Sequence, residues 1–168
     1  MADKRMLKLL EASLFDPRPF MEDKPWKVSG QDLRAEALRE IEPDKLLFDN
    51  CTRQEDVNKV ITGYERLSRL EENGNIRLDV RTMVTLSKEN RKRTLELVYS
   101  EKKVRFLCFF GTIFCAQNGK QYVPSLYRSG TEAWNIGCRL MDSEFDKDDY
   151  SVCLVPYLRV VALNRFRT

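Results

Sequence analysis

A nearly continuous apolar run from Val104 to Ala116 constrains the fold more than any other feature of this sequence. Two lysines precede the run, and Asn118-Gly119 follows it. Such a run is typical of a central strand that is covered on both faces, and Gly111 inside it indicates a bulge or a bend. Because Asn118-Gly119 is a strong hairpin signal, the segment from Lys120 to Leu126 is expected to return beside this strand.

Other segments are expected to form strands as well. From Ile76 to Leu86, apolar residues and threonine fall on alternate positions, which predicts a strand with one solvated face. The segment from Tyr150 to Phe166 is predicted to form one or two strands bent at Pro156. Residues Thr94 to Ser100 fit either a strand or a helical turn, and the pattern does not separate the two.

Helices are predicted from capping patterns and from the spacing of apolar residues. Thr52 and Glu55 form a capping box before an apolar stripe at helical spacing, and Asn73-Gly74 ends this predicted helix. A similar pattern predicts a helix over residues 29–43, where a proline closes it. A third, short helix is expected over residues 131–141.

The amino-terminal segment is expected to form a short arm. An amphipathic helix is predicted over residues 3–15, with Leu7, Leu10 and Leu14 on one face. This helix could dock its leucines on the core, or it could lie on an anionic membrane or partner. Residues 20–28 are expected to be an irregular linker that lies on the body of the protein.

The length and composition favour one folded domain. The chain has 168 residues, of which 42% are hydrophobic and 33% are charged, far from the composition of disordered chains. The prediction is a single α+β domain in which an antiparallel sheet packs against two or three helices. Residues 1–28 are assigned to the helical arm and its linker, and residues 29–168 to the globular part.

Cysteine usage and hydropathy bear on the compartment. There are five cysteines without a CxxC pair, an odd set that is typical of free structural thiols in a reducing environment: Cys51, Cys108, Cys115, Cys138 and Cys153. The apolar run near the amino end is too short and too charged for a signal peptide, and no later stretch reaches membrane-spanning length. The expectation is a protein that is neither secreted nor integral to a membrane.

The sequence lacks the residues on which most catalytic sites depend. It contains no histidine, the commonest general base and the usual partner of a nucleophilic serine or cysteine. The acidic loop from Asp142 to Asp149 spaces its carboxylates like the start of an EF-hand, but the turn glycine is missing and Cys153 stands where glutamate is required. No Walker or dinucleotide glycine pattern is present. We therefore expect no enzyme activity, metal, cofactor or small-molecule substrate.

Basic clusters are the more informative candidates for function. The formal net charge of +3 is small, so an anionic partner would have to meet a local patch. Two clusters flank residues 94–100, and they would form one patch if that segment reverses direction: Lys88, Arg91, Lys92 and Arg93, and then Lys102, Lys103 and Arg105. Phosphates of RNA or headgroups of anionic lipid would suit such a patch. The alternative is a solvated turn whose charges protect an apolar strand from aggregation.

Aromatic residues offer a further possibility. Tyr122 and Tyr127 could stack on bases if both side chains faced one groove, but the sequence does not decide this.

The centre of the chain resembles the matrix proteins of rhabdoviruses, most of all those of the plant-infecting cytorhabdoviruses. The resemblance lies in Val84-Thr85-Leu86-Ser87, Asn90-Arg91, Arg93-Thr94-Leu95-Glu96-Leu97-Val98-Tyr99, and Arg105-Phe106-Leu107-Cys108-Phe109-Phe110-Gly111-Thr112, roughly a quarter of the chain. In that family a strand is followed by a polar turn, an Arg-Ser or Arg-Thr pair, and an apolar strand that closes on Gly-Ser.

The resemblance implies an α+β fold and a protein that self-associates, condenses the nucleocapsid and joins it to the envelope during budding. By position, Arg91, Lys92 and Arg93 would lie in the turn after the first strand. The basic amino-terminal arm used on membranes would comprise Lys4, Arg5, Leu7 and Lys8. The segment between Arg93 and Val104 is expected to be too short for the full helix of the animal viruses, and the sequence has no PPxY or P(T/S)AP budding motif.

These observations lead to one functional hypothesis and one alternative. The hypothesis is a matrix-like structural protein that self-associates, binds anionic membrane and nucleocapsid, and supports virion assembly from the host cytoplasm and the inner face of the membrane or virion. The alternative is a small RNA-binding protein, such as a viral suppressor of RNA silencing, in which the same clusters hold phosphates. A cellular adaptor without an anionic ligand would leave both clusters as solvated surface.

Overall fold

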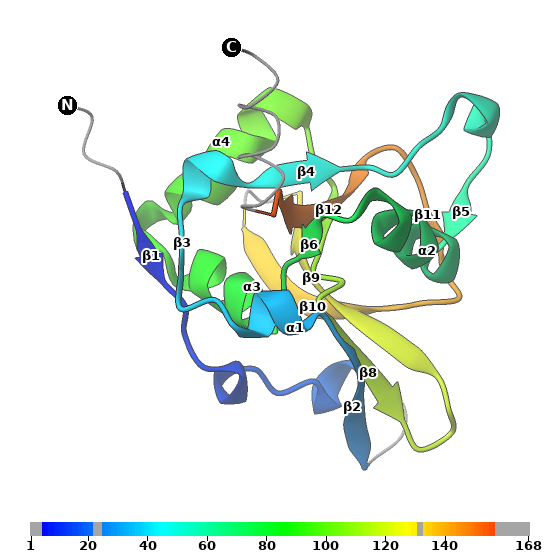
Figure 1. Ribbon diagram of the computed structural model, residues 1–168, viewed down its shortest axis with the longest axis horizontal. Helices are drawn as coiled ribbons and strands as arrows, with labels where there is room; N and C mark the ends of the chain where they lie inside the picture. Colours follow the sequence, from blue (N-terminus) through cyan, green and yellow to red (C-terminus); the bar gives the residue numbers. More distant parts are fainter. Residues whose placement is uncertain (1–4, 22–24, 131–132, 157–168) are drawn as a thin grey trace.

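A large mixed sheet organises the protein (Figure 1). The structure is a computed structural model, and it describes residues 5–21, 25–130 and 133–156. The sheet has eight strands in the order β2-β8-β9-β7-β12-β4, with β10 beside β9 and β6 beside β12. The bounds of these strands are β2 (Trp26–Gln31), β4 (Leu47–Asp49), β6 (Ile76–Arg77), β7 (Phe106–Cys108), β8 (Thr112–Ala116), β9 (Gln121–Arg128), β10 (Trp134–Leu140) and β12 (Asp149–Leu154).

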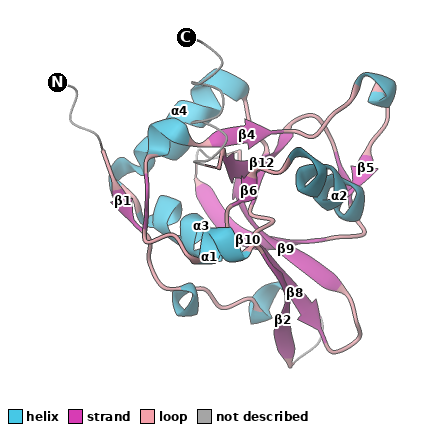
Figure 2. Ribbon diagram, viewed as in Figure 1, coloured by secondary structure: helices cyan, strands magenta, loops and turns pink. Residues whose placement is uncertain are grey.

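Short strand pairs and helices complete the fold (Figure 2). Two small ladders join β1 (Leu7–Lys8) to β3 (Glu40–Ile41) and β5 (Ile61–Thr62) to β11 (Glu144–Phe145). The helices are α1 (Leu33–Glu36), α2 (Gly63–Asn73), α3 (Val80–Lys88) and α4 (Arg93–Lys102), and the 3-10 turns are η1 (Ala12–Leu14), η2 (Arg18–Phe20), η3 (Pro43–Lys45), η4 (Gln54–Asp56) and η5 (Asn90–Lys92). The predicted α+β class and the single domain are confirmed. The sheet is antiparallel except for the pair β7 and β12, which is parallel.

The apolar run forms two strands, β7 and β8, which separate at the expected glycine. The N–H of Gly111 donates to the carbonyl oxygen of Leu78 at 2.9 Å. A Cβ atom at position 111 would overlap the carbonyl oxygen of Arg77, so this close approach of two backbones requires glycine. The predicted hairpin is confirmed as well, since β8 and β9 are joined across Gly119, whose φ is +85°.

Apolar side chains cover the sheet on both faces. On one face, α3 and α4 bury residues such as Met83 and Leu95 against the strands. On the other face, Leu70 of α2 packs with Phe110 and Phe145. This arrangement explains the uninterrupted apolar character of the central strands, because neither face is solvated.

The predicted strand from Ile76 to Leu86 is wrong beyond its first residues. Only β6 is a strand, and α3 follows it directly. Asp79 caps this helix by accepting hydrogen bonds from the N–H groups of Arg81 and Thr82. Because α3 is buried on nearly all sides, it has no polar face, and its sequence therefore lacks the 3.6-residue period that indicates a helix.

The predicted amino-terminal helix over residues 3–15 is also wrong. The described part of this segment is the strand β1 followed by η1. Leu7 pairs with Ile41 in β3, and the N–H of Leu10 donates to Thr85 Oγ1 at 2.9 Å. Tertiary partners thus satisfy the backbone in an extended form. Phe15 enters the core, whereas Leu14 is exposed.

Three further expectations need correction. Residues 131–141 were expected to be helical, but β10 occupies 134–140 and pairs along its whole length with β9. The supposed linker at 20–28 contains the start of β2. The helix expected over 52–73 begins later, because Thr62 accepts the capping hydrogen bond from the N–H of Glu65. Its predicted end at Gly74, with a φ of +72°, is confirmed.

The remaining segments differ less from expectation. The helix expected over 29–43 is present only as the four-residue α1, capped by Asp32. The segment 94–100 lies inside α4, which answers the question that the sequence left open and shows that a ten-residue helix does fit there. The acidic loop contains β11, and the last strand described is β12, so the expected bend beyond Pro156 lies outside the described residues.

Candidate functional site: an unpaired basic turn

The turn between α3 and α4 brings together the first predicted basic cluster. After Glu89, the chain reverses through Arg91 and Lys92, whose φ angles of 52° and 47° lie in the left-handed region. It then enters α4 at Arg93. We call Lys88, Arg91, Lys92 and Arg93 the basic turn. Three of these side chains are exposed, and that of Lys92 is half-buried because its Nζ donates to the carbonyl oxygen of Ser87.

Arg91 and Arg93 differ from all other arginines that the structure describes. Neither side chain has a hydrogen bond or an ion pair within the described residues. Every other arginine in those ranges donates to a carboxylate, a hydroxyl or a carbonyl oxygen. The basic turn therefore holds two guanidinium groups whose donors are free to meet a ligand.

A shallow groove runs from the basic turn along α4. Its volume is about 950 Å³, and the residues that line it include Arg5, Leu7, Arg91, Arg93 and Leu97. Leu97 is 53% exposed, so an apolar side chain lies on the same surface as the unpaired cations.

One carboxylate lies close to the basic turn, and it is already occupied. Glu89 is nearly buried and accepts from the guanidinium of Arg5, while its second oxygen accepts from the N–H of Thr94 at 3.3 Å. Its charge is thus matched by the amino-terminal segment. The charges of Arg91 and Arg93 are left without a counter-ion on the described surface.

The second predicted basic cluster lies at the other end of α4. The ten residues of this helix separate the two clusters by about 15 Å along its axis. The expectation that residues 94–100 reverse direction and merge the clusters is therefore wrong. Lys102 and Lys103 lie near the carboxyl end of the helix, where cations are favoured by the helix dipole.

The side chains of this second cluster have partners. The ammonium groups of Lys102 and Lys103 lie over the rings of Tyr150 and Tyr99, at 5.6 and 5.2 Å from their centroids. Arg105 donates to Asp146 at 2.7 Å and also pairs with Asp149. These contacts give the second cluster a structural role in holding the end of α4 near the acidic loop.

The structure places the predicted arm residues against the body of the protein. Arg5 donates to Thr94 Oγ1 at 2.6 Å in addition to its pair with Glu89. Leu7 is half-buried and packs against the core, while Lys8 is exposed. Lys4 lies outside the described residues. Of this arm, Lys8 is the described cation that stays available.

The two tyrosines considered for base stacking do not share a groove. They are five positions apart on β9 and so lie on opposite faces of the strand. Tyr122 is buried in the core, and Tyr127 packs on Phe106 with the ring centroids 5.6 Å apart. Neither ring is presented to a ligand at the basic turn.

Cysteine and carboxylate chemistry is constrained by burial and pairing. Burial raises the pKa of Cys51 and Cys138 to about 12 and that of Cys108 to about 11, so these thiols remain protonated at neutral pH. In the part of the chain that the structure describes, no three potential metal ligands cluster together. Asp149 of the acidic loop is buried and bound to arginines.

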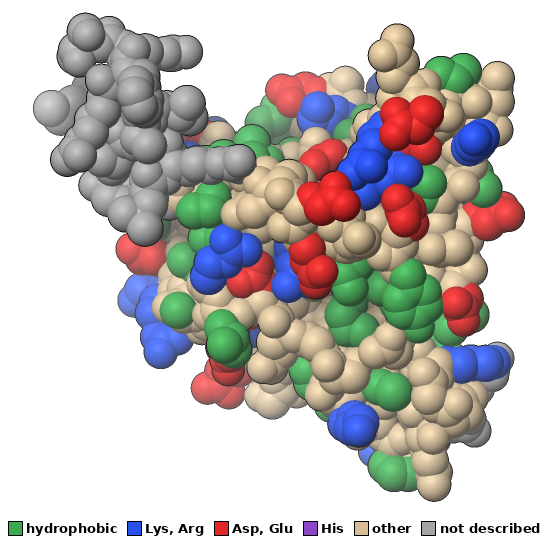
Figure 3. All heavy atoms as spheres, turned by 45° about the vertical axis from the view of Figure 1, so that its right-hand side comes forward, with side chains coloured by type: hydrophobic (Ala, Val, Ile, Leu, Met, Phe, Trp, Pro, Cys, Tyr) green, Lys and Arg blue, Asp and Glu red, His purple; other side chains and the backbone are tan. Residues whose placement is uncertain are grey.

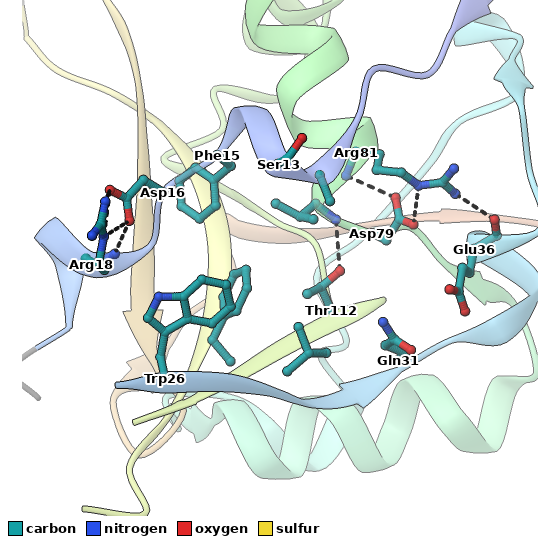
Figure 4. Close-up of a pocket in the computed structure, with 14 residues that line it drawn as sticks. Ser13, Phe15, Asp16, Arg18, Trp26, Gln31, Glu36, Asp79, Arg81 and Thr112 are labelled. Carbon is teal, nitrogen blue, oxygen red and sulfur yellow. Dashed lines mark hydrogen bonds and ion pairs between the residues drawn. The ribbon is translucent and has the colours of Figure 1, made fainter. Parts of the chain in front are cut away.

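A separate cavity was not foreseen from the sequence (Figure 4). It has a volume of about 610 Å³ and lies between η1, β2 and the start of α3. Aromatic rings form its apolar part: Phe15, Trp26 and Phe114. Because residues 20–28 were expected to be a linker and 76–86 a strand, its walls could not be assembled in advance. The alternation of Trp26 and Val28 was the available signal for β2.

Comparisons with known proteins give no relative for this chain. No family model matches it, and no match was found among curated proteins or solved structures. No described helix has the length and apolar character needed to cross a membrane.

Proposed function

We propose that this chain is a non-enzymatic binding and assembly protein of the matrix type, which attaches to anionic membrane surfaces through the basic turn. The observation that carries the proposal is the absence of partners for Arg91 and Arg93, in contrast to the arginines elsewhere in the described residues. Exposed cations that are not committed to internal pairs keep their charge available for an external anion.

The surroundings of the basic turn favour a lipid surface over RNA. Leu97 projects beside the cations and could enter the boundary between headgroups and acyl chains. Recognition of single-stranded RNA would instead call for exposed rings beside the cations, and no aromatic residue lines the groove along α4. The proposed roles in self-association and nucleocapsid binding rest on the resemblance to rhabdovirus matrix proteins.

A vesicle sedimentation experiment tests the proposal. The protein is mixed with vesicles of phosphatidylcholine, with and without phosphatidylserine, at one ionic strength. The variant Arg91→Gln/Arg93→Gln is compared with Lys59→Gln/Lys147→Gln, which removes the same charge from exposed positions elsewhere. Since a cation near such a surface contributes about 1 kcal/mol, the first variant should bind about 30-fold more weakly. The control should retain most of the affinity.

Two results would overturn the proposal. Equal losses in both variants would mean that net charge, and not the basic turn, decides binding. Retention of a single-stranded RNA probe by the wild-type protein, without any binding to phosphatidylserine vesicles, would favour the RNA-binding alternative.

A further inference from the structure

Strand β2 forms a free edge of the large sheet. It is six residues long and terminal in the strand order, whereas β4 at the other end has three residues. All its residues except Gly30 are exposed. No backbone hydrogen bond joins the outer side of β2 to another described segment, so a row of N–H and C=O groups is left for an added strand.

Apolar side chains lie beside this free edge. Trp26 and Val28 alternate along β2 on one face of the sheet, and they are 36% and 41% exposed. The indole of Trp26 meets the ring of Phe114 edge-on, with the centroids 5.3 Å apart. Both residues line the cavity of Figure 4, which opens next to the edge. A free edge beside an apolar cavity is the geometry of recognition by strand addition.

We propose that β2 pairs antiparallel with β2 of a second copy of the chain, about a two-fold axis perpendicular to the sheet. This axis keeps the same face of both sheets on one side, so that the stripe of Trp26 and Val28 continues into that of the second copy. The contact is closed and self-complementary, as in most homodimers. It supplies a surface for the self-association in the proposed function, and it rests on that function for its biological role.

Charge favours the antiparallel arrangement and a copy of the same strand. Lys27 near one end of β2 and Glu36 beside the other end have no ion pair within the described residues. Gln31 and Glu36 lie at one end of the cavity, and Trp26 lies at the other (Figure 4). An antiparallel pair brings Lys27 of each copy toward Glu36 of the other, whereas a parallel pair would set like charges together.

Two features of β2 oppose pairing, and both are small. Lys27 is the only charged residue on the strand, and one register shift lies between Val28 and Gly30. Strands that avoid association carry several charges, a proline or a short length. The predicted pairing is therefore reversible and depends on concentration.

Sedimentation equilibrium over a range of protein concentrations tests the inference. The wild type should show a reversible dimer. Val28→Lys should raise the dissociation constant at least tenfold, whereas Val57→Lys, at an apolar position that is 70% exposed and distant in sequence, should leave it unchanged. Circular dichroism of both variants separates weakened association from unfolding. A wild type that stays monomeric, or equal effects of the two substitutions, would overturn the inference.

A charge exchange identifies the partner and its direction. Lys27→Glu and Glu36→Lys should each weaken the dimer, and the double variant should restore it. Failure of the double variant to recover would contradict the antiparallel pairing. The Arg91→Gln/Arg93→Gln variant should dimerise like the wild type, so a failed dimer and a failed membrane attachment are recognised independently.

Discussion

Arginines in the region around Asp149 and arginines in the basic turn occupy opposite environments. Arg66 is fully buried and donates to the carbonyl oxygens of Asp146 and Asp149. Arg139 lies 3.9 Å from the ring centroid of Phe145 and pairs with the carboxylate of Asp149 at 3.0 Å. In the basic turn, by contrast, two arginines contact no described acceptor.

The difference shows that residue type alone does not identify a binding site. A buried guanidinium must have its donors and charge satisfied, since an unmet group in the interior is costly. On the face that carries α2, acidic and basic side chains lie next to one another (Figure 3). Arg53 pairs there with Glu72, and Arg69 with Asp56. Only where folding leaves the cations unmatched does a basic cluster become available for an external ligand.

The largest effect is expected from Asp149→Asn. This buried carboxylate pairs with Arg105 and Arg139, so its neutralisation leaves uncompensated cations in the interior. The free energy of unfolding should fall by about 4 kcal/mol. Urea denaturation followed by circular dichroism measures it. An unchanged midpoint would mean that the region does not depend on ion pairing.

A smaller but still large effect is expected from Arg66→Met. Methionine keeps most of the apolar volume but removes the donors to two carbonyl oxygens. The free energy of unfolding should fall by about 3 kcal/mol, as estimated for two hydrogen bonds from a charged group. The same denaturation experiment applies. A loss below that of an exposed arginine substitution would contradict the structural role of Arg66.

The pair of Arg69 and Asp56 provides a test by pH. The hydrogen bonds from Arg69 lower the pKa of Asp56 to about 2. Because the folded pKa lies below the unfolded value of about 3.9, this pair stabilises the fold above that pH and loses its contribution as pH falls toward 2. In Arg69→Gln, the pKa of Asp56 should rise toward its ordinary value. NMR titration of the carboxyl carbon measures this shift, and an unmoved pKa would refute the pairing.

The smallest effect on stability is expected in the basic turn. Since Arg91 and Arg93 have no described partner, the variant Arg91→Gln/Arg93→Gln should change the free energy of unfolding by less than about 0.5 kcal/mol. A loss comparable to that of Arg66→Met would show that these arginines are structural, and the contrast between the two regions would fail.

Local signals in the sequence identified part of this picture. The hairpin at Asn118-Gly119, the bend at Gly111 and the crowding of cations in the basic turn depend on neighbouring residues, and all were predictable. The helix α3 was not predicted, because its burial on nearly all sides removes the polar face that would indicate a helix. In β10, the alternation of Trp134, Ile136, Cys138 and Leu140 was a usable signal that the interpretation missed.

Pairing of charges was beyond what the sequence could provide. Arg105 looked equivalent to Arg91 in the sequence, yet its partner Asp146 is 41 residues away along the chain. Such contacts depend on the path of the whole chain, so the division into structural and available cations needed the structure. The edge of β2 was hidden for the same reason, since its position at the end of the sheet depends on the order of all strands.

The salt dependence of vesicle binding tests the central claim most directly. Affinity for phosphatidylserine vesicles is measured from low to physiological ionic strength for the wild type and for Arg91→Gln/Arg93→Gln. If the two unpaired arginines meet the anionic surface, wild-type affinity should fall steeply with salt, and the variant should be weaker with a shallower slope. Identical slopes would contradict the claim that these arginines form the attachment site.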